Sequence, residues 1–344
     1  MPRFELDRRS LLMGALALAA CDGAAQPTVA VDRGPAPALK AIAPFPVGTC
    51  VYIEALSQPD YIVHLTRHFD QIVAEWQMKM EVIVKENGQL DFSEPDLIAE
   101  FARDHGLRLH GHTLTWFSQR PAAFERLLSD RPAFARAYDG YIRAVVGRYR
   151  GQAVSWDVVN EPIEENGEGI RGGIWSEAFG PAFIDRAFAV AHEADPQAVL
   201  FLNEYDLESR PEKRRTFLRL VETLLKRGVP VGGLGTQCHM SLETPASEIV
   251  ASMRDLGAFG LPIHVSELYV WMQRDDLDAQ ARQVSVLAEA FAALPERQRF
   301  AFTVWGLRDK DSWRKSEDPR QRPLLLDDNG RPKPAFWAAV DAWS

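Results

Sequence analysis

The feature that most constrains the fold is the alternation of short, apolar, β-like runs with longer amphipathic stretches from about residue 44 onward. This alternation is typical of α/β folds built on a parallel sheet. The strand candidates are Gly48–Ile53, Gln71–Glu75, Leu107–Leu114, Val154–Asn160, Val199–Asn203, Gly233–His239, Ile263–Glu267 and Phe300–Trp305. Eight strands alternating with helices over roughly 300 residues fit a (β/α)8 TIM barrel. A doubly wound open sheet is disfavoured because no Gly-rich nucleotide-binding loop follows an early strand.

Two of the intervening helices carry clear boundary signals. One begins at Arg131-Pro132, with proline in its first turn, and ends at Gly151. Its apolar stripe consists of Phe134, Tyr138, Tyr141, Val145 and Tyr149. The other runs from Glu212 to Arg227, with basic residues in its last turn and Gly228 as its C-cap.

Composition limits the class of protein. Hydrophobic residues make up 46% and charged residues 25% of the chain, which excludes a mostly disordered protein. The net charge of −9 argues against nucleic acid as a partner and indicates a solvated acidic surface. No composition break divides residues 44–344, so we expect a single catalytic domain acting as a monomer. We interpret Cys50 and Cys238 as buried thiols, since a disulfide framework needs more cysteines.

The first 43 residues predict an export signal and a tether. Arg8 and Arg9 precede a short apolar run, too short to span a bilayer, which ends in a lipobox-like Leu-Ala-Ala before Cys21. Residues 1–21 are therefore predicted to be a twin-arginine-like signal with a lipid on Cys21. Residues 22–43, rich in Ala, Pro and Gly, are predicted to be a flexible tether. We expect a periplasmic or membrane-anchored bacterial protein that contacts a membrane only through this lipid. The alternative is a plain signal peptide cut near Ala20.

Polar side chains lie at or near the ends of most predicted strands. These residues are Glu75, His112, Asn160, Glu161, Asn203, Glu204, Gln237, His239 and Glu267, and Trp305 ends the last strand. Burial of such polar groups without partners costs several kilocalories per mole. In a TIM barrel the carboxyl ends of the strands form the active-site face. We therefore expect these residues to meet at one mouth of the barrel.

Glu161 ends the fourth predicted strand and Glu267 the seventh, so the two face each other across that mouth. Two carboxylates flanking a cleft are what glycoside hydrolysis requires. At a separation of about 5.5 Å and an effective dielectric near 20, they repel by roughly 3 kcal/mol, so one stays protonated as the acid. A rival interpretation, a metal held by His110 and His112, lacks further ligands at suitable spacing. We expect neither a metal nor a cofactor.

The motifs around these residues resemble glycoside hydrolase family 10, the endo-β-1,4-xylanases. The matching stretches are Gly111–Trp116, Trp156–Glu161, Leu202–Tyr205, Gln237–His239, Ser266–Leu268, Thr303–Gly306, Asp309–Trp313 and Lys333–Trp337. The resemblance implies a retaining endo-β-1,4-xylanase that hydrolyses internal links of xylan or xylo-oligosaccharides.

The resemblance also implies individual roles. Glu161 is the expected acid/base and Glu267 the expected nucleophile, while Asn160 is expected to hydrogen-bond the 2-hydroxyl of the reacting sugar. The other substrate-binding residues that it implies are Glu75, Lys79, His112, Trp116, Gln119, Tyr205, Gln237, His239, Trp305 and Trp313.

Three positions depart from the family pattern. Trp76 stands where an amide usually binds the sugar two places from the cleavage point. Tyr269 replaces the aspartate that usually orients the residue equivalent to His239, so we expect His239 to be less readily protonated and the acidic limb of the pH–rate profile to shift. Phe117 replaces a common histidine, and the sequence offers no account of its consequence.

Two alternatives stay open. One is a related β-glycosidase that acts on short or different β-glycans, which Trp76 favours. The other is a non-catalytic glycan-binding lipoprotein on a degenerate barrel. The presence of Glu161, Glu267 and Asn160 argues against the second, because a binding protein does not need a matched acid and nucleophile.

Overall fold

The computed structural model describes residues 33–344, and its folded unit comprises Pro37–Ser344. The predicted export signal with Cys21, and residues 22–32 of the predicted tether, lie outside the described residues.

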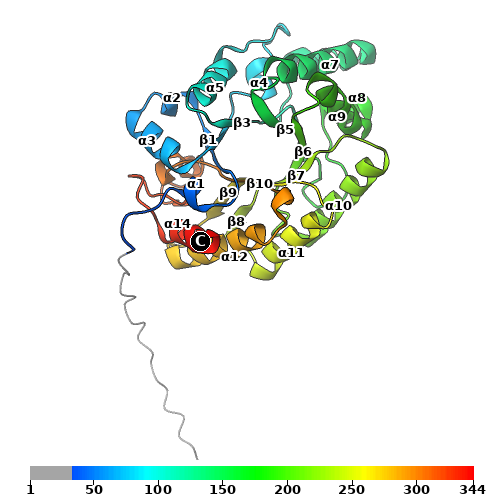
Figure 1. Cartoon of the computed structure of the whole chain (residues 1–344). Helices are drawn as coiled ribbons and strands as arrows, with labels where there is room; N and C mark the ends of the chain where they lie inside the picture. The colour runs from blue at the N-terminus through cyan, green and yellow to red at the C-terminus, as the bar shows by residue number, and fades with distance from the viewer. Residues whose placement is uncertain (1–32) are drawn as a thin grey trace, which may run out of the picture. The chain divides into compact units, whose positions relative to one another are not determined.

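The folded unit is built around parallel strands. They are β1 (Val47–Val51), β2 (Gln71–Ala74), β3 (Arg108–Gly111), β4 (Thr115–Trp116), β5 (Ala153–Asn160), β6 (Val199–Glu204), β7 (Gly233–Thr236), β8 (His239–Ser241), β9 (Ile263–Trp271) and β10 (Arg299–Val304). Eight of them form a closed barrel in the order β1-β2-β3-β5-β6-β7-β9-β10, because β10 pairs with both β9 and β1 (Figure 1). The predicted (β/α)8 barrel is confirmed.

Two predicted strands end earlier than expected, and each is followed by a short second strand. The run predicted as Leu107–Leu114 ends as β3 at Gly111, and the chain resumes as β4, which pairs with β5. The run predicted as Gly233–His239 ends as β7 at Thr236 and resumes as β8, which pairs with β9. Cys238, between β7 and β8, has a φ of 52°, which a regular strand cannot accommodate. The interruptions lie at the mouth of the barrel, where the predicted site residues gather.

Helices surround the barrel (Figure 1). They are α1 (Leu39–Ile42), α2 (Ile53–Leu56), α3 (Pro59–His68), α4 (Met80–Ile83), α5 (Ser93–Asp104), α6 (Ala122–Glu125), α7 (Arg131–Arg148), α8 (Ile174–Phe179), α9 (Ala182–Ala194), α10 (Pro211–Lys226), α11 (Ala246–Gly257), α12 (Leu277–Ala292), α13 (Arg314–Glu317) and α14 (Pro334–Trp343), with 3-10 turns at Glu296–Gln298 and Asp309–Asp311. In residues 33–344 no helix is long and apolar enough to cross a membrane.

Helices α7 and α10 begin and end close to their predicted boundaries. The Asp130 side chain caps α7 by accepting a hydrogen bond from the backbone N–H of Ala133 at 3.0 Å. Helix α7 ends at Arg148, three residues before the predicted Gly151. Gly228 follows α10 with a φ of 74°, the left-handed conformation that a C-cap glycine adopts.

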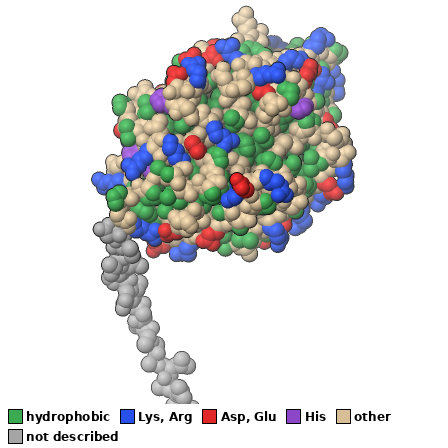
Figure 2. All heavy atoms as spheres, viewed as in Figure 1, with side chains coloured by type: hydrophobic (Ala, Val, Ile, Leu, Met, Phe, Trp, Pro, Cys, Tyr) green, Lys and Arg blue, Asp and Glu red, His purple; other side chains and the backbone are tan. Residues whose placement is uncertain are grey.

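The domain begins earlier than the predicted boundary at residue 44. Leu39, in α1, is fully buried, and Lys40 donates a hydrogen bond to the backbone oxygen of Thr66 in α3. Residues 37–43 therefore belong to the folded unit. The sequence did not indicate this, because one turn of helix with one apolar anchor is too short to give a periodic signal. Cys50 and Cys238 are free, buried thiols, which agrees with their interpretation. Acidic and basic side chains are interspersed over the face seen in Figure 2.

Candidate active site

The carboxyl ends of the barrel strands surround a cleft of about 620 Å³. The predicted site residues that line it are Glu75, Lys79, His112, Trp116, Asn160, Glu161, Tyr205, Gln237, His239, Glu267, Trp305 and Trp313. The other lining residues are Trp76, Asp206, Ser209, Met240, Ser241, Thr244, Tyr269, Trp271 and Arg314. Most of the polar strand ends therefore meet at one mouth, as expected, but Asn203 and Glu204 are fully buried and lie outside the set of lining residues.

Gln119 differs from its expected place. It is 8% exposed and lies outside the set of cleft-lining residues. Its Oε1 accepts a hydrogen bond from the backbone N–H of Glu81 at 2.7 Å, so the side chain fastens the start of α4, which follows Lys79 directly. We therefore assign Gln119 to holding the segment that carries Lys79, and not to lining the sugar subsite.

Glu161 follows β5 directly and its carboxylate is held by three donors. Trp116 Nε1 donates to Oε2 at 2.8 Å, while Gln237 Nε2 and Asn160 Nδ2 donate to Oε1 at 2.9 and 3.2 Å. The φ of Glu161 is 56°, so the chain turns sharply where the strand ends. The carboxyl group is therefore fixed in position and still faces the cleft.

Glu267 lies in β9 and is 4% exposed. Asn203 Nδ2 donates to its Oε1 at 2.9 Å, and His239 Nε2 lies 3.3 Å from its Oε2. Burial alone would raise the pKa of Glu267, but the hydrogen bond with His239 and the electrostatic interactions with His112 and His239 outweigh it and lower this pKa. The group is therefore kept ionised, as a nucleophile must be.

An amide network connects the two carboxyl groups. The Nδ2 atom of Asn203 donates both to Glu267 and, at 2.8 Å, to Oδ1 of Asn160. Asn160 in turn donates to Glu161. Ser266 Oγ donates to Oδ1 of Asn203 at 2.8 Å and fixes the orientation of its amide. The sequence marked Asn203 only as a polar strand end, and its contacts with both sides become visible only once β5, β6 and β9 are placed side by side.

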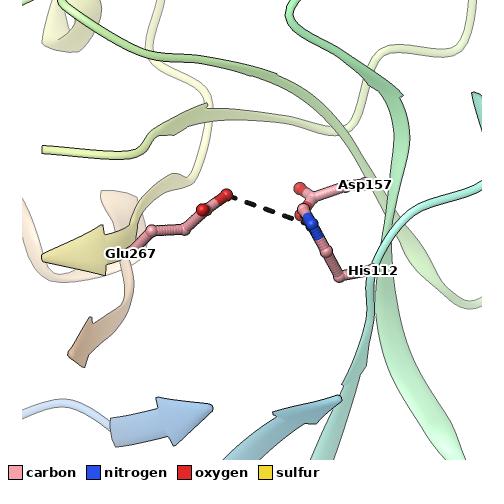
Figure 3. Close-up of side chains that lie close together, drawn as sticks. All are labelled: His112, Asp157 and Glu267. Atoms are coloured by element: carbon pink, nitrogen blue, oxygen red, sulfur yellow. Dashed lines mark hydrogen bonds and ion pairs between the residues drawn. The ribbon is translucent and has the colours of Figure 1, made fainter. Parts of the chain in front are cut away.

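Asp157 lies beside His112 and orients its ring (Figure 3). His112 Nδ1 lies 2.8 Å from Asp157 Oδ2, and His110 Nε2 lies 2.9 Å from the same oxygen. His110 Nδ1 contacts Ser155 Oγ at 2.7 Å. Burial would raise the pKa of Asp157, but the two histidines lower it well below its usual range. Asp157 therefore joins His110 and His112 through one carboxylate oxygen.

These contacts bear on the metal hypothesis. In the described part of the chain, one group of donor atoms is compact enough to hold a metal ion, formed by His112, Asp157 and Glu267, whose atoms lie within 4.8 Å of one another. His112 is already paired with Asp157, and its Nδ1 lies 4.0 Å from Glu267 Oε1 (Figure 3). We assign the group to positioning His112 beside Glu267, and the expectation of no metal stays a prediction.

One end of the cleft combines a carboxyl, an amine and two rings. Burial raises the pKa of Glu75 to about 7, although Lys79 opposes this shift. Lys79 Nζ lies 4.7 Å from the centre of the Trp116 ring. Trp76 stacks on Tyr52, with 5.4 Å between ring centres and 20° between planes, and it stays 38% exposed. The ring that replaces the family amide is therefore a supported aromatic surface.

Tyr205 is held by charged residues behind the cleft. Its hydroxyl accepts a hydrogen bond from Arg171 at 2.8 Å and donates to Glu165. Lys213 Nζ lies 3.1 Å from the centre of the tyrosine ring and 2.9 Å from Glu204 Oε1. Burial raises the pKa of Glu204 to about 7 against the opposing effect of Lys213. Arg171 and Lys213 therefore position Tyr205, although neither lies in a sequence motif that points to the site.

Phe117 now has a structural account. Its ring lies under the guanidinium of Arg171, 4.2 Å from ring centre to Cζ, and it does not line the cleft. Arg171 Nε also donates to the backbone oxygen of Glu161 at 3.1 Å. Phe117 therefore supports an arginine that connects Glu161 with Tyr205.

Tyr269 contacts His239 through its ring and Arg314 through its hydroxyl. Its ring stacks on His239, with 4.3 Å between centres and 26° between planes, while its hydroxyl accepts a hydrogen bond from Arg314 Nη2 at 2.6 Å. Burial raises the pKa of Tyr269 to about 12, although Arg314 opposes the shift. The phenol hydroxyl thus faces Arg314, and it orients His239 by packing and not by a hydrogen bond.

Two further tryptophans line the cleft. Trp305 is 6% exposed and packs edge-on against His112, with 5.3 Å between ring centres. Trp313 is 36% exposed and stands edge-on to Tyr269 at 6.0 Å. A largely buried ring beside the carboxylates and an exposed ring at the opening are suited to a flat ligand with apolar faces.

Comparison with known proteins places this site in a family. The profile of glycosyl hydrolase family 10 matches residues 38–342. Endo-1,4-beta-xylanase A of Caldicellulosiruptor sp. (strain Rt8B.4) is 36% identical over 319 residues, which cover 86% of this chain and 46% of that relative. The chain thus spans under half the length of this relative. The endo-1,4-beta-xylanase of Geobacillus stearothermophilus is 35% identical over 300 residues, covering 80% of this chain and 90% of that relative.

The crystal structure of xylanase B from Clostridium stercorarium F9 superimposes with a TM-score of 0.81 at 31% identity, covering 89% of this chain and all of the other. With its barrel, its paired glutamates and a profile match over nearly the whole folded unit, the chain belongs to glycosyl hydrolase family 10.

Proposed function

We propose that this chain is a retaining endo-β-1,4-xylanase that acts as a monomer without a cofactor. The observation that carries the proposal is the pair Glu161 and Glu267 in one cleft, each held by its own donors and joined through Asn160 and Asn203. Relatives described as endo-1,4-beta-xylanases support xylan as the substrate.

The first half of the proposed reaction forms a glycosyl-enzyme. Glu161 gives its proton to the leaving oxygen while the carboxylate of Glu267 attacks the anomeric carbon, so the glycosidic bond breaks as the ester bond forms. Water then attacks the same carbon, Glu161 takes its proton, and Glu267 leaves as a carboxylate. Asn160 is the proposed donor to the sugar 2-hydroxyl, a contact that strengthens in the transition state.

The test is product analysis of the full chain on β-1,4-xylan and on defined xylo-oligosaccharides. We expect a ladder of short products from the polymer, with the β-anomer appearing first by NMR. Products only from short oligosaccharides would favour the related β-glycosidase. Binding of xylan without any cleavage would overturn the proposal in favour of a glycan-binding protein.

The pH dependence tests the role of Tyr269. Glu267 reacts as a carboxylate, so kcat/KM falls as the pH drops through its pKa, which is already lowered. In Tyr269→Asp, a carboxylate beside His239 would favour the protonated ring, and that cation would keep Glu267 ionised to lower pH. We expect the acidic limb of kcat/KM to move to lower pH in this variant. Tyr269→Phe, which keeps the ring, should leave the limb in place, and identical limbs in all three proteins would contradict this role.

Substitution of Trp76 tests whether the enzyme is a xylanase or a β-glycosidase that acts on short substrates. Because Tyr52 supports the ring and one part of it is exposed, we propose that it stacks on a sugar. Trp76→Asn should then lower kcat/KM about 2- to 12-fold on oligosaccharides long enough to reach it, and leave shorter ones unchanged. Trp76→Phe is the matched control that keeps a ring. A rise in kcat/KM on long substrates would mean that the tryptophan blocks the cleft, and would favour the second function.

We also propose that the chain is exported and carries a lipid on Cys21. In the bacterial host, Cys21→Ser should move the protein from the membrane fraction to the soluble fraction and abolish metabolic labelling with a fatty acid. Cys50→Ala is the matched control, because that thiol is buried and should have no part in labelling. Labelling that persists in Cys21→Ser would contradict the anchor and favour the plain signal peptide.

A further inference from the structure

Arg314 presents a guanidinium to the cleft that the proposed hydrolytic steps do not use. It is the first residue of α13 and lines the cleft next to Trp313. Its side chain is 23% exposed. The proposed reaction needs a proton donor and a nucleophile, which Glu161 and Glu267 supply.

The guanidinium is held in place mainly by neutral groups. Its Cζ lies 4.3 Å from the centre of the Trp313 ring and 4.9 Å from that of Tyr269, and its Nη2 donates to the Tyr269 hydroxyl. Tyr269 is itself fixed by stacking on His239. The position of Arg314 is therefore defined before any ligand binds, but these rings and the hydroxyl do not neutralise its charge.

The carboxylate that Arg314 contacts is replaceable. Nη1 donates to Glu317, three residues further along α13, and the Glu317 side chain is 52% exposed. An exposed pair of this kind contributes little stability, because water solvates both partners when they separate. A carboxylate arriving in the cleft can therefore share the guanidinium with Glu317 or take its place.

The other cationic side chain on the cleft wall is matched differently. Lys79 acts electrostatically on Glu75, and both residues line the cleft. Among the neighbours of Arg314, Lys315 is paired with Asp328, and the cleft-lining Asp206 is paired with Arg210 at 3.1 Å. Arg314 is thus the cleft cation whose carboxylate partner is exposed to solvent.

We propose that Arg314 binds a carboxylate carried as a side group on the substrate, so that the enzyme prefers xylan with uronic-acid substituents. This inference rests on the proposed xylanase function. The planar fork of a guanidinium matches both oxygens of a carboxylate, and such charge-assisted pairs are stronger than hydrogen bonds to neutral hydroxyls. Trp313, 36% exposed, provides ring surface beside it for the substituent sugar, and Trp271, 41% exposed, provides a second ring on the wall of the same cleft.

The experiment compares two substrates that differ in one group. Xylo-oligosaccharides bearing a glucuronic acid are assayed beside the same compounds with the carboxyl group reduced to an alcohol. The full-length protein should show a kcat/KM about tenfold higher on the acidic compound, and this preference should shrink as ionic strength rises. Because the readout is a ratio, a general loss of activity in a variant cancels.

Three variants define the outcome. Arg314→Gln should bring the ratio to about 1, and Arg314→Lys should give an intermediate ratio, since it keeps the charge and loses the fork. Glu317→Gln removes the competing carboxylate and should raise the ratio. A ratio near 1 in the unmodified protein, or one that Arg314→Gln leaves unchanged, would overturn the inference alone. No turnover of either compound would also overturn the inference if the undecorated xylo-oligosaccharides are cleaved, and would overturn the proposed xylanase function if they are not.

Discussion

Glu267→Gln is expected to lower kcat on xylo-oligosaccharides by about 10⁴- to 10⁶-fold, the range seen when one member of a matched catalytic set is removed. The amide has nearly the shape of the carboxylate but cannot form the glycosyl bond. Asn203 Nδ2, which donates to Oε1 at 2.9 Å, can donate equally to an amide oxygen, so the fold of the site should persist. Steady-state kinetics on xylohexaose measures the loss, and an unchanged thermal unfolding midpoint verifies the fold.

Chemical rescue gives this prediction a stereochemical control. In Glu267→Ala, azide can enter the space left by the side chain and attack the anomeric carbon from the face that the nucleophile used. An activated aryl β-xyloside should then yield the α-glycosyl azide, because one displacement inverts the carbon. A β-azide, or activity in Glu267→Gln close to that of the unmodified protein, would mean that the nucleophile has been assigned to the wrong residue.

Much of the barrel could be predicted because each of its strands is marked by a local pattern in the sequence. Each barrel strand is a short apolar run, and the residues that end those runs meet at one mouth by the geometry of parallel strands, so Glu161 and Glu267 could be found without a structure. The same logic placed Asn160 and His112 in the cleft.

The remainder depended on contacts between distant segments. Tyr269 could be recognised as a departure, but its hydroxyl partner Arg314 is 45 residues away and in a different element. Gln119 lies three residues after the matching stretch Gly111–Trp116, and only the placement of Glu81 shows that its side-chain carbonyl is already used. Leu39 anchors a single turn in a segment whose composition is typical of a tether.

Glu161→Ala is expected to separate the two halves of the reaction. With a sugar as leaving group, the loss of the proton donor should lower kcat/KM by about 10²- to 10⁴-fold. With an activated phenol, which leaves without protonation, glycosylation should proceed nearly unchanged. The glycosyl-enzyme on Glu267 should then accumulate, since no base activates water, and a burst of phenol equal to the enzyme concentration should precede a slow steady state.

The hydrogen bonds to Glu161 supply the matched control. Trp116→Phe removes the donor to Oε2 but leaves those from Gln237 and Asn160 to Oε1, so the acid stays in place with one contact fewer. We expect a loss of about tenfold on sugar leaving groups in this variant and no burst.

Azide added to Glu161→Ala should yield the β-glycosyl azide, the opposite anomer from that of Glu267→Ala, because here two displacements occur at the same carbon. Equal losses on sugar and phenol leaving groups would show that Glu161 acts otherwise than by proton transfer. Opposite anomers from the two alanine variants would assign each face of the sugar to one glutamate.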